Sequence, residues 1–135
     1  MAGYSGTPLV KKLGIKPGQQ IALLSGPPGY RKTLGALPVK VTCTEHLVDK
    51  LDFIQVFVTS QAELKQRFKD AKRCLAMNGS LWISWPKKTS GMATDLNENL
   101  LREIGLGLGL VDVKVCAVDE TWSGLKFVYR LKDRL

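Results

Sequence analysis

The sequence predicts an α/β fold: a sheet of about six strands, mostly parallel, with helices on its faces and an antiparallel hairpin at its end. Residues 52–58 form an almost continuous apolar run, too short for a helix and typical of a strand buried on both faces. A helical segment and a second apolar run at 80–85 follow, and such a strand–helix–strand unit crosses over with a right hand. Residues 111–118 and 125–131 alternate between apolar and polar side chains, which indicates two strands with one exposed face each.

The helix of this central unit has recognisable start and stop residues. Ser60 and Glu63 form a capping box, in which the serine oxygen accepts from the backbone N–H of Glu63 and the glutamate reaches back. Apolar residues then recur at helical spacing. Asn78 and Gly79 both tolerate the left-handed conformation, so we expect the helix to end there.

The remaining segments continue the alternation of helices and strands. The expected order is a helix at 9–13, a strand at 20–25, a short helix at 31–37, a brief strand at 39–43 and, after the central unit, a helix capped by Thr94 or Asp95. The glycines of residues 105–109 look like a phosphate-binding fingerprint. They close a helix, however, whereas a phosphate loop opens one, so we expect a glycine-rich helix end.

Length and composition indicate one domain, residues 1–135, with its own core. The sequence lacks both an apolar run of about 20 residues and a signal-peptide pattern, so we expect a cytoplasmic protein without a membrane span. Cys43, Cys74 and Cys116 are widely spaced, and we expect free thiols in a reducing compartment. No metal site is expected, because His46 is the only histidine and no Cys-x-x-Cys pair exists.

The net charge of +8 and the pI of about 9.6 favour acidic partners. Nucleic acid is one such partner, since phosphates attract basic proteins whatever the base sequence. The basic residues are spread along the chain, with no run longer than two, which is also common in basic proteins of other function.

The loops after the parallel strands are where an open α/β sheet binds its ligand, because the carboxyl ends of these strands share one edge. The first loop carries Gly26 and Gly29, Glu45 follows the second strand, and Thr59 and Ser60 follow the third. The other candidates follow the fourth strand or lie in the terminal hairpin: Trp85, Lys87, Lys88, Glu120 and Trp122. We expect these residues to form a ligand-binding edge and assign no catalytic residue.

Each candidate also has a purely structural interpretation. Gly26 and Gly29 let the backbone approach a nucleoside, or they form only a tight turn, since the two prolines between them remove two amide donors. Glu45 is placed to accept the hydroxyls of a ribose, or it is one of many surface acids. Lys87 and Lys88 could hold a phosphate or carboxylate as point charges beside an aromatic wall, or the tryptophans belong to the core.

The order of elements resembles that of class I methyltransferases, whose Rossmann-like sheet alternates strands and helices and ends in an antiparallel hairpin. The resemblance covers nearly the whole chain: residues 17–18 before the first strand, 52–54 before a middle one, 75–82 leading into the next, and the terminal hairpin. Between the first strand and Asp52 there is room for one strand, where the full fold has two. The resemblance implies a single three-layer domain and S-adenosylmethionine as the cofactor to test.

At closer range, residues 4–9, 81–88 and 118–126 resemble a family of small bacterial proteins without an assigned activity. This resemblance implies a bacterial protein of the cytosol.

Three functions are consistent with these patterns. The first hypothesis is a non-catalytic module that binds a small molecule or a protein, because the first loop lacks the Gly-x-Gly pattern of the methyltransferases. The second is a methyltransferase dependent on S-adenosylmethionine, and the third is a basic protein associated with nucleic acid. The missing glycines favour the non-catalytic module over the methyltransferase. Strongly salt-dependent binding to unrelated duplexes would favour the nucleic-acid-associated protein. Whether the protein is an enzyme stays open at this point.

Overall fold

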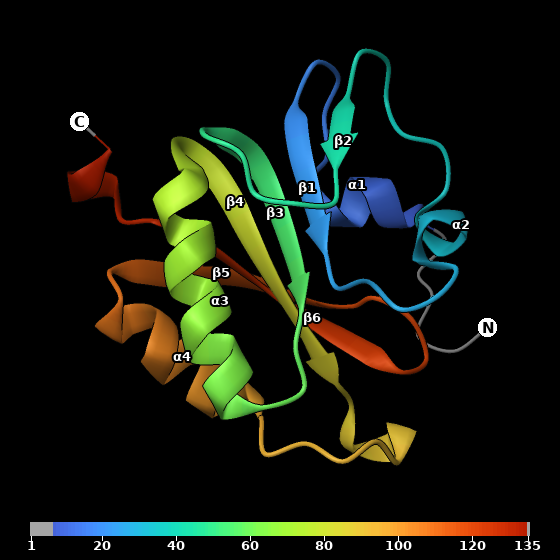
Figure 1. Ribbon diagram of the computed structural model, residues 1–135, viewed down its shortest axis with the longest axis vertical. Helices are drawn as coiled ribbons and strands as arrows, with labels where there is room; N and C mark the ends of the chain where they lie inside the picture. Colours follow the sequence, from blue (N-terminus) through green and yellow to red (C-terminus); the bar gives the residue numbers. More distant parts are fainter. Residues whose placement is uncertain (1–6, 135) are drawn as a thin grey trace.

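A six-stranded sheet forms the centre of the molecule (Figure 1). The computed structural model describes residues 7–134. Its strands are, in chain order, β1 (Gln20–Leu24), β2 (Thr42–Thr44), β3 (Leu51–Phe57), β4 (Leu75–Pro86), β5 (Leu110–Ala117) and β6 (Trp122–Tyr129). Across the sheet they run β2-β1-β3-β4-β6-β5; the first four are parallel, and β6 is antiparallel to both of its neighbours. The predicted α/β fold is confirmed.

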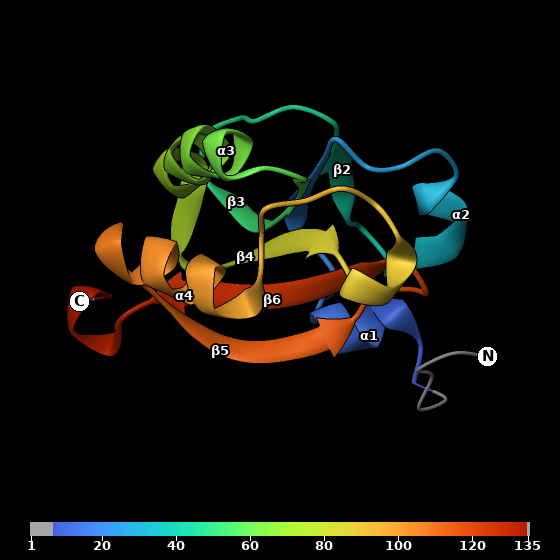
Figure 2. The same ribbon diagram turned by 90° about the horizontal axis from the view of Figure 1, so that it is seen from below.

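The helices cover both faces of the sheet, and each face has its own apolar core. The α-helices of the described chain are α1 (Leu9–Leu13), α2 (Tyr30–Leu34), α3 (Gln61–Cys74) and α4 (Glu98–Gly107), with short 3-10 helices η1 (Lys88–Ser90) and η2 (Leu131–Asp133). Figure 2 shows α3 and α4 on one side of the sheet and α1 on the other. The α1–α2 core includes Leu13, Tyr30, Phe53, Trp82 and Trp122. The α3–α4 core includes Ile54, Phe68, Trp85, Leu101 and Phe127.

The central unit is β3, α3 and β4, and its capping box is confirmed. The Ser60 side chain accepts from the Glu63 N–H at 3.2 Å, and the Glu63 carboxylate accepts from the Thr59 N–H at 3.0 Å. The helix ends at Cys74, however, and the predicted stop at 78–79 is wrong. Leu75 already pairs with Leu51 in the ladder, and the residues after it bulge before regular pairing resumes. The ladder and the burial of Leu75 therefore decide where the helix ends.

The start of α4 also differs from the prediction. Asn97 is its N-cap, with its side-chain oxygen accepting from the Leu100 N–H at 2.9 Å. Thr94 instead donates to the Thr59 carbonyl at 2.7 Å, and Asp95 accepts from the Gln61 N–H at 2.9 Å. The two predicted caps thus attach the preceding loop to the start of α3.

The other boundaries follow from backbone conformation. The helix predicted at 31–37 stops at Leu34, because Gly35 has φ 85° and ψ −164°, which no helix continues. The predicted strand at 39–43 is shorter too, since Lys40 has φ 61° and pairing with β1 begins only at Thr42. The predicted glycine-rich end of α4 is confirmed: the helix ends at Gly107 and Gly109 has φ 90°.

Three further expectations concern the chain as a whole. Residues 4–6, part of the first stretch that resembles the bacterial family, lie outside the described residues. Among residues 7–134, no helix combines the length and apolar character that crossing a membrane requires. Cys43, Cys74 and Cys116 are free and half-buried. Burial raises the pKa of each thiol.

Candidate functional site

A cavity of about 440 Å³ opens at the carboxyl end of β1. We call it the glycine–proline cavity; its lining consists of Leu23, Ser25, Gly26, Pro27, Pro28, Gly29, Tyr30, Arg31 and Glu45. The residues come from the end of β1, the loop into α2 and the position after β2. This is the edge at which an open α/β sheet binds ligands, and the volume suits a small molecule.

The loop of this cavity has an unusual backbone. Ser25 has φ 58°, a left-handed conformation that is uncommon for a residue with a side chain, and Gly29 has φ 80°. The Ser25 hydroxyl accepts from the Arg67 guanidinium at 2.9 Å, which ties the loop to α3. The contact between Ser25 and Arg67 was not predicted, since neither a φ value nor a contact across 42 positions is visible in a linear pattern.

Backbone donors remain in the loop despite its prolines. Within the described residues, the N–H groups of Gly26 and Gly29 make no hydrogen bond. Gly29 also has no heavy atom within 4 Å of where a Cβ would lie. A ligand carboxylate or hydroxyl can therefore approach the Gly29 backbone closely, whereas the Tyr30 side chain lies 3.4 Å from where a Cβ of Gly26 would be.

Glu45 supplies an acceptor to the same cavity. Its side chain is exposed, lines the cavity and has no hydrogen-bond or ion-pair partner in the part of the chain that the structure describes. Arg31 lies on the same cavity, but its guanidinium donates to the Cys43 sulfur at 3.4 Å. The Glu45 carboxylate is thus available to accept hydroxyl groups.

A buried polar chain holds the loop against the sheet. The Tyr30 hydroxyl donates to Gln55 Oε1 at 2.6 Å, and Gln55 Nε2 donates to Ser84 Oγ at 3.1 Å. Gln55 and Ser84 have no exposed surface. Burial raises the pKa of the Tyr30 phenol, and the hydrogen bond to Gln55 offsets this only in part. In the sequence, only Gln55, a polar residue within a mostly apolar strand, indicated that buried hydrogen bonds such as these would be present.

Thr59 and Ser60 have structural roles. Both belong to the start of α3, where they complete the capping box with Glu63. The Thr59 carbonyl also accepts from Thr94. Neither residue lines the glycine–proline cavity.

Trp85, Lys87 and Lys88 line a different cavity, of about 270 Å³. We call it the tryptophan–lysine cavity. Its lining shares no residue with that of the glycine–proline cavity. The residues expected to share one ligand-binding edge therefore line two cavities. Gly26, Gly29 and Glu45 line the glycine–proline cavity, and Trp85, Lys87 and Lys88 line the tryptophan–lysine cavity.

Glu120 and Trp122 line neither cavity. Trp122 is 7% exposed and packs edge-to-face on Phe57, with ring centroids 5.0 Å apart. The Asp119 carboxylate closes the turn by accepting from the N–H groups of Thr121 and Trp122, both at 2.8 Å. Glu120 is exposed on this turn. The structure thus gives Trp122 a place in the α1–α2 core.

Among residues 7–134, no three or more His, Cys, Asp or Glu side chains come together as a group that could hold a metal ion.

Comparison with known proteins extends this picture. No protein-family model matches the sequence, and no curated protein matches it. Solved structures do match. A SAM-dependent methyltransferase from Aquifex aeolicus has 17% identity and a TM-score of 0.64, covering 88% of this chain and 86% of that one. The DhpI–SAH complex has 12% identity and a TM-score of 0.63, covering 92% and 83%.

A third similar structure is magnesium protoporphyrin IX methyltransferase from Synechocystis with bound SAH. It has 13% identity and a TM-score of 0.57, covering 90% of this chain and 78% of that one. At these identities the likeness concerns the fold alone. The chain has a methyltransferase-like fold, as its order of elements predicted.

Proposed function

We propose that the protein binds S-adenosylmethionine in the glycine–proline cavity and is a methyltransferase dependent on that cofactor. The observation that carries the proposal is the position of Glu45. Its unpaired carboxylate faces the same cavity as the first loop, after the second strand of a methyltransferase-like sheet. An acidic residue at this place can accept the two hydroxyls of a ribose.

The other cavity residues fit the remaining parts of the cofactor. The free N–H groups of Gly26 and Gly29 can donate to its carboxylate, and Leu23 with the prolines offers apolar contact to its adenine. When bound, S-adenosylmethionine supplies a methyl group activated by its positively charged sulfur. The residues that would hold it are therefore Glu45 and the loop at 25–30.

The titratable groups of this cavity limit which substrates can accept the methyl group. Burial raises the pKa of Tyr30, so this phenol keeps its proton near neutral pH and does not act as a base. Arg31 is a permanent cation. Glu45 is the remaining titratable group of this cavity lining, and we assign it to the ribose. We infer that the methyl acceptor is nucleophilic without a proton being removed from it by Tyr30 or Arg31.

Isothermal titration with S-adenosylhomocysteine at moderate salt tests the binding step. We expect one-to-one, micromolar binding, and we expect Glu45→Gln to weaken it about tenfold or more, as the loss of charge-assisted hydrogen bonds does. Glu120→Gln is the matched control, because it removes an exposed acid that lies outside the cavity. An absence of heat at high protein concentration, or equal weakening by both variants, would contradict the proposal.

The non-catalytic hypothesis remains a prediction that the same protein can test. Transfer of a labelled methyl group from S-adenosylmethionine to components of a cell extract supports the enzyme, provided that Glu45→Gln reduces it. Binding of S-adenosylhomocysteine without any transfer supports the non-catalytic module. A cytoplasmic location, where free thiols stay reduced, is part of our proposal in both cases.

A further inference from the structure

The tryptophan–lysine cavity lies between the end of β4, η1, the start of α4 and Ser123 of β6. We propose that it binds a small organic anion, namely a carboxylate or phosphate attached to a flat apolar group. With about 270 Å³ it is smaller than most pockets for drug-sized ligands, so a compact molecule fits better than a nucleotide.

The wall is apolar and contains an indole N–H without a partner among the described residues. Trp85 and Leu96 are each only 6% exposed, and Pro86 lies beside them. The indole N–H of Trp85 has no hydrogen-bond partner anywhere in residues 7–134. By contrast, the indole of Trp82 donates to the Leu13 carbonyl at 2.8 Å. Among the described residues, Arg130 Nε is the one buried side-chain nitrogen or oxygen without a hydrogen-bond partner, so the Trp85 N–H is reached by solvent and is open to an acceptor of a ligand.

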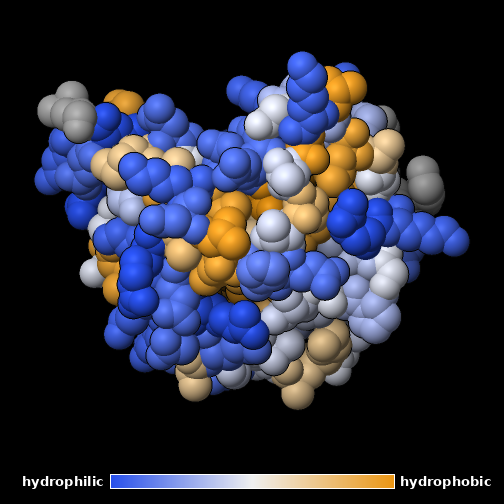
Figure 3. Space-filling model, turned by 45° about the horizontal axis from the view of Figure 1, so that its top comes forward, coloured by the Kyte–Doolittle hydropathy of each residue, from blue (hydrophilic) through white to orange (hydrophobic). Residues whose placement is uncertain are grey.

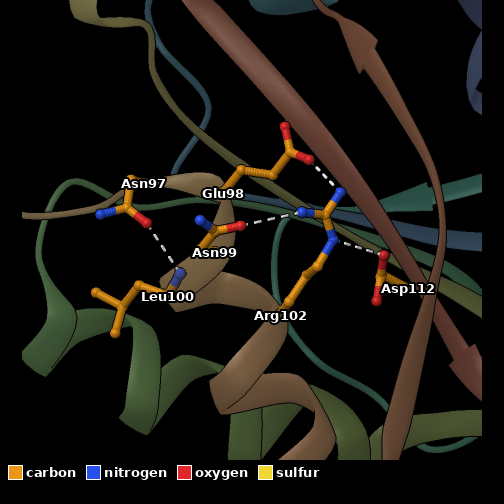
Figure 4. A network of polar contacts seen from close by, with 6 residues as sticks. All are labelled: Asn97, Glu98, Asn99, Leu100, Arg102 and Asp112. Carbon is orange, nitrogen blue, oxygen red and sulfur yellow. Dashed lines mark hydrogen bonds and ion pairs between the residues drawn. The ribbon is translucent and has the colours of Figure 1, made fainter.

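The polar groups around this wall are mainly donors. Lys87 and Lys88 line the cavity, and within the described chain neither ammonium group has an ion-pair or hydrogen-bond partner. Asn97 uses its side-chain oxygen to cap α4 (Figure 4), which leaves its NH₂ group as a further donor. A set of donors with two positive charges selects a ligand rich in acceptors, which means an anion.

The one carboxylate in this lining already has a cationic partner. Glu98 pairs with Arg102, which also donates to Asp112 at 2.9 Å and so links α4 to β5 (Figure 4). The Glu98 charge is therefore directed to a cation outside the cavity lining. It opposes an incoming anion less than a free carboxylate would.

The lysines project from a segment that is held in place. The Lys87 N–H donates to the Thr121 carbonyl at 2.8 Å, and its carbonyl accepts from the Ser90 hydroxyl at 2.6 Å. Pairing of Pro86 with Trp122 continues the ladder up to this point. Preorganisation of this kind lowers the entropy cost of binding.

This inference does not depend on the proposed cofactor site. The two cavities share no lining residue, and their buried walls belong to different faces of the sheet: Trp85 to the α3–α4 core, Leu23 and Tyr30 to the α1–α2 core. Either cavity can therefore prove functional without the other.

The test is a titration of the full chain, followed through the indole N–H resonances in ¹⁵N correlation spectra. Trp85→Phe assigns the Trp85 resonance. The probes are benzoate, phenyl phosphate and, as the uncharged control, benzyl alcohol. We expect a saturable shift of the Trp85 resonance with at least one of the two anions. We further expect Lys87→Ala/Lys88→Ala to raise its Kd about tenfold or more, the usual effect of losing charge-assisted hydrogen bonds.

The double variant Lys65→Ala/Lys69→Ala is the matched control, because it removes the same charge from the exposed side of α3. It should leave the Kd unchanged. Stronger binding of benzoate or of phenyl phosphate decides between carboxylate and phosphate. The inference fails if neither anion moves the Trp85 resonance, if benzyl alcohol binds equally well, or if both double variants weaken binding alike. Titration of Lys87→Ala/Lys88→Ala with S-adenosylhomocysteine shows whether the first cavity is intact.

Discussion

At the scale of single residues, Gln55 joins three elements of the fold through buried hydrogen bonds. It stands between Ile54 and Val56 in β3, and it is fully buried. Its amide connects Tyr30 of α2 with Ser84 of β4, so that three elements meet at one side chain. Because the amide has a partner at both ends, the cost of burying it is offset.

Tyr30→Phe should therefore destabilise the protein. The variant leaves Gln55 Oε1 buried without a donor, which costs about 1–3 kcal/mol. Urea denaturation at neutral pH measures the change. Tyr129→Phe is the matched control, since its hydroxyl donates to the Lys72 carbonyl at a half-buried site and its loss should cost less. Equal effects of the two variants would contradict the role given to the buried chain.

The same residue predicts a dependence of stability on pH. Burial raises the pKa of Tyr30 above its ordinary value of 10.0. Above that pH the unfolded chain releases the proton while the folded protein retains it, so folding loses stability as pH rises from about 10. We expect the difference in stability between wild type and Tyr30→Phe to shrink between neutral pH and pH 11 or so. A constant difference would show that Tyr30 ionises equally in both states.

At the scale of elements, α4 lies unusually close to the sheet. A Cβ built at Gly105 would be 2.2 Å from Cε1 of Phe127 in β6, whereas one at Gly107 would have no neighbour within 4 Å. Neither glycine has a positive φ. Glycine at 105 is therefore required by packing, and glycine at 107 is not.

This contrast predicts opposite results for the same substitution two residues apart. Gly105→Ala forces Phe127 to move and should lower the free energy of unfolding by about 1–3 kcal/mol. Gly107→Ala should leave stability unchanged or raise it by up to about 1 kcal/mol, because alanine favours the helix. Thermal and urea unfolding of both variants provide the measurement. A loss of similar size at Gly107 would mean that the contact with Phe127 does not explain the loss at Gly105.

At the scale of the whole molecule, charge and topology set what can bind. The chain carries a net charge of +8. Figure 3 shows a mostly hydrophilic surface with hydrophobic areas in the middle of the view and toward its upper right. On the face of the terminal hairpin next to α1, Lys114 pairs directly opposite Lys126, and Lys114 donates to the Lys12 carbonyl at 3.0 Å. Burial and the charges of Lys114 and Lys16 lower the pKa of Lys126. Like charges opposite each other are unfavourable unless a partner compensates for them.

The nucleic-acid prediction can be tested on this pair. Fluorescence anisotropy with two duplexes of unrelated sequence should show equal binding at low salt. The logarithm of the affinity should fall linearly with that of the salt concentration, with a slope of about −0.9 per phosphate contacted. Lys114→Gln/Lys126→Gln should weaken binding more than Lys65→Gln/Lys69→Gln, which removes the same charge. No binding at low salt would exclude nucleic acid as a partner. Equal weakening by the two double variants would mean that binding depends on net charge and not on the Lys114–Lys126 pair.

Sequence by itself determined the fold class, because periodicity and burial are local consequences of side-chain chemistry. The unbroken apolar run at 52–58 and the alternation at 111–118 identified buried and half-exposed strands. The capping box of α3 was readable for the same reason, since Ser60 and Glu63 interact within one turn. The resemblance of this element order to methyltransferases followed, and the structural neighbours agree with it.

Only the tertiary structure decided the end of α3, the cap of α4 and the division of the candidate residues between two cavities. Leu75 belongs to β4 and not to α3, because pairing with Leu51 in the sheet stabilises it more than continuing the helix would. Gly26 and Glu45 share a cavity because β1 and β2 are parallel neighbours, whereas Trp85 faces the other side of the sheet. Such outcomes depend on contacts between residues far apart in the chain, and local sequence carries little information about them.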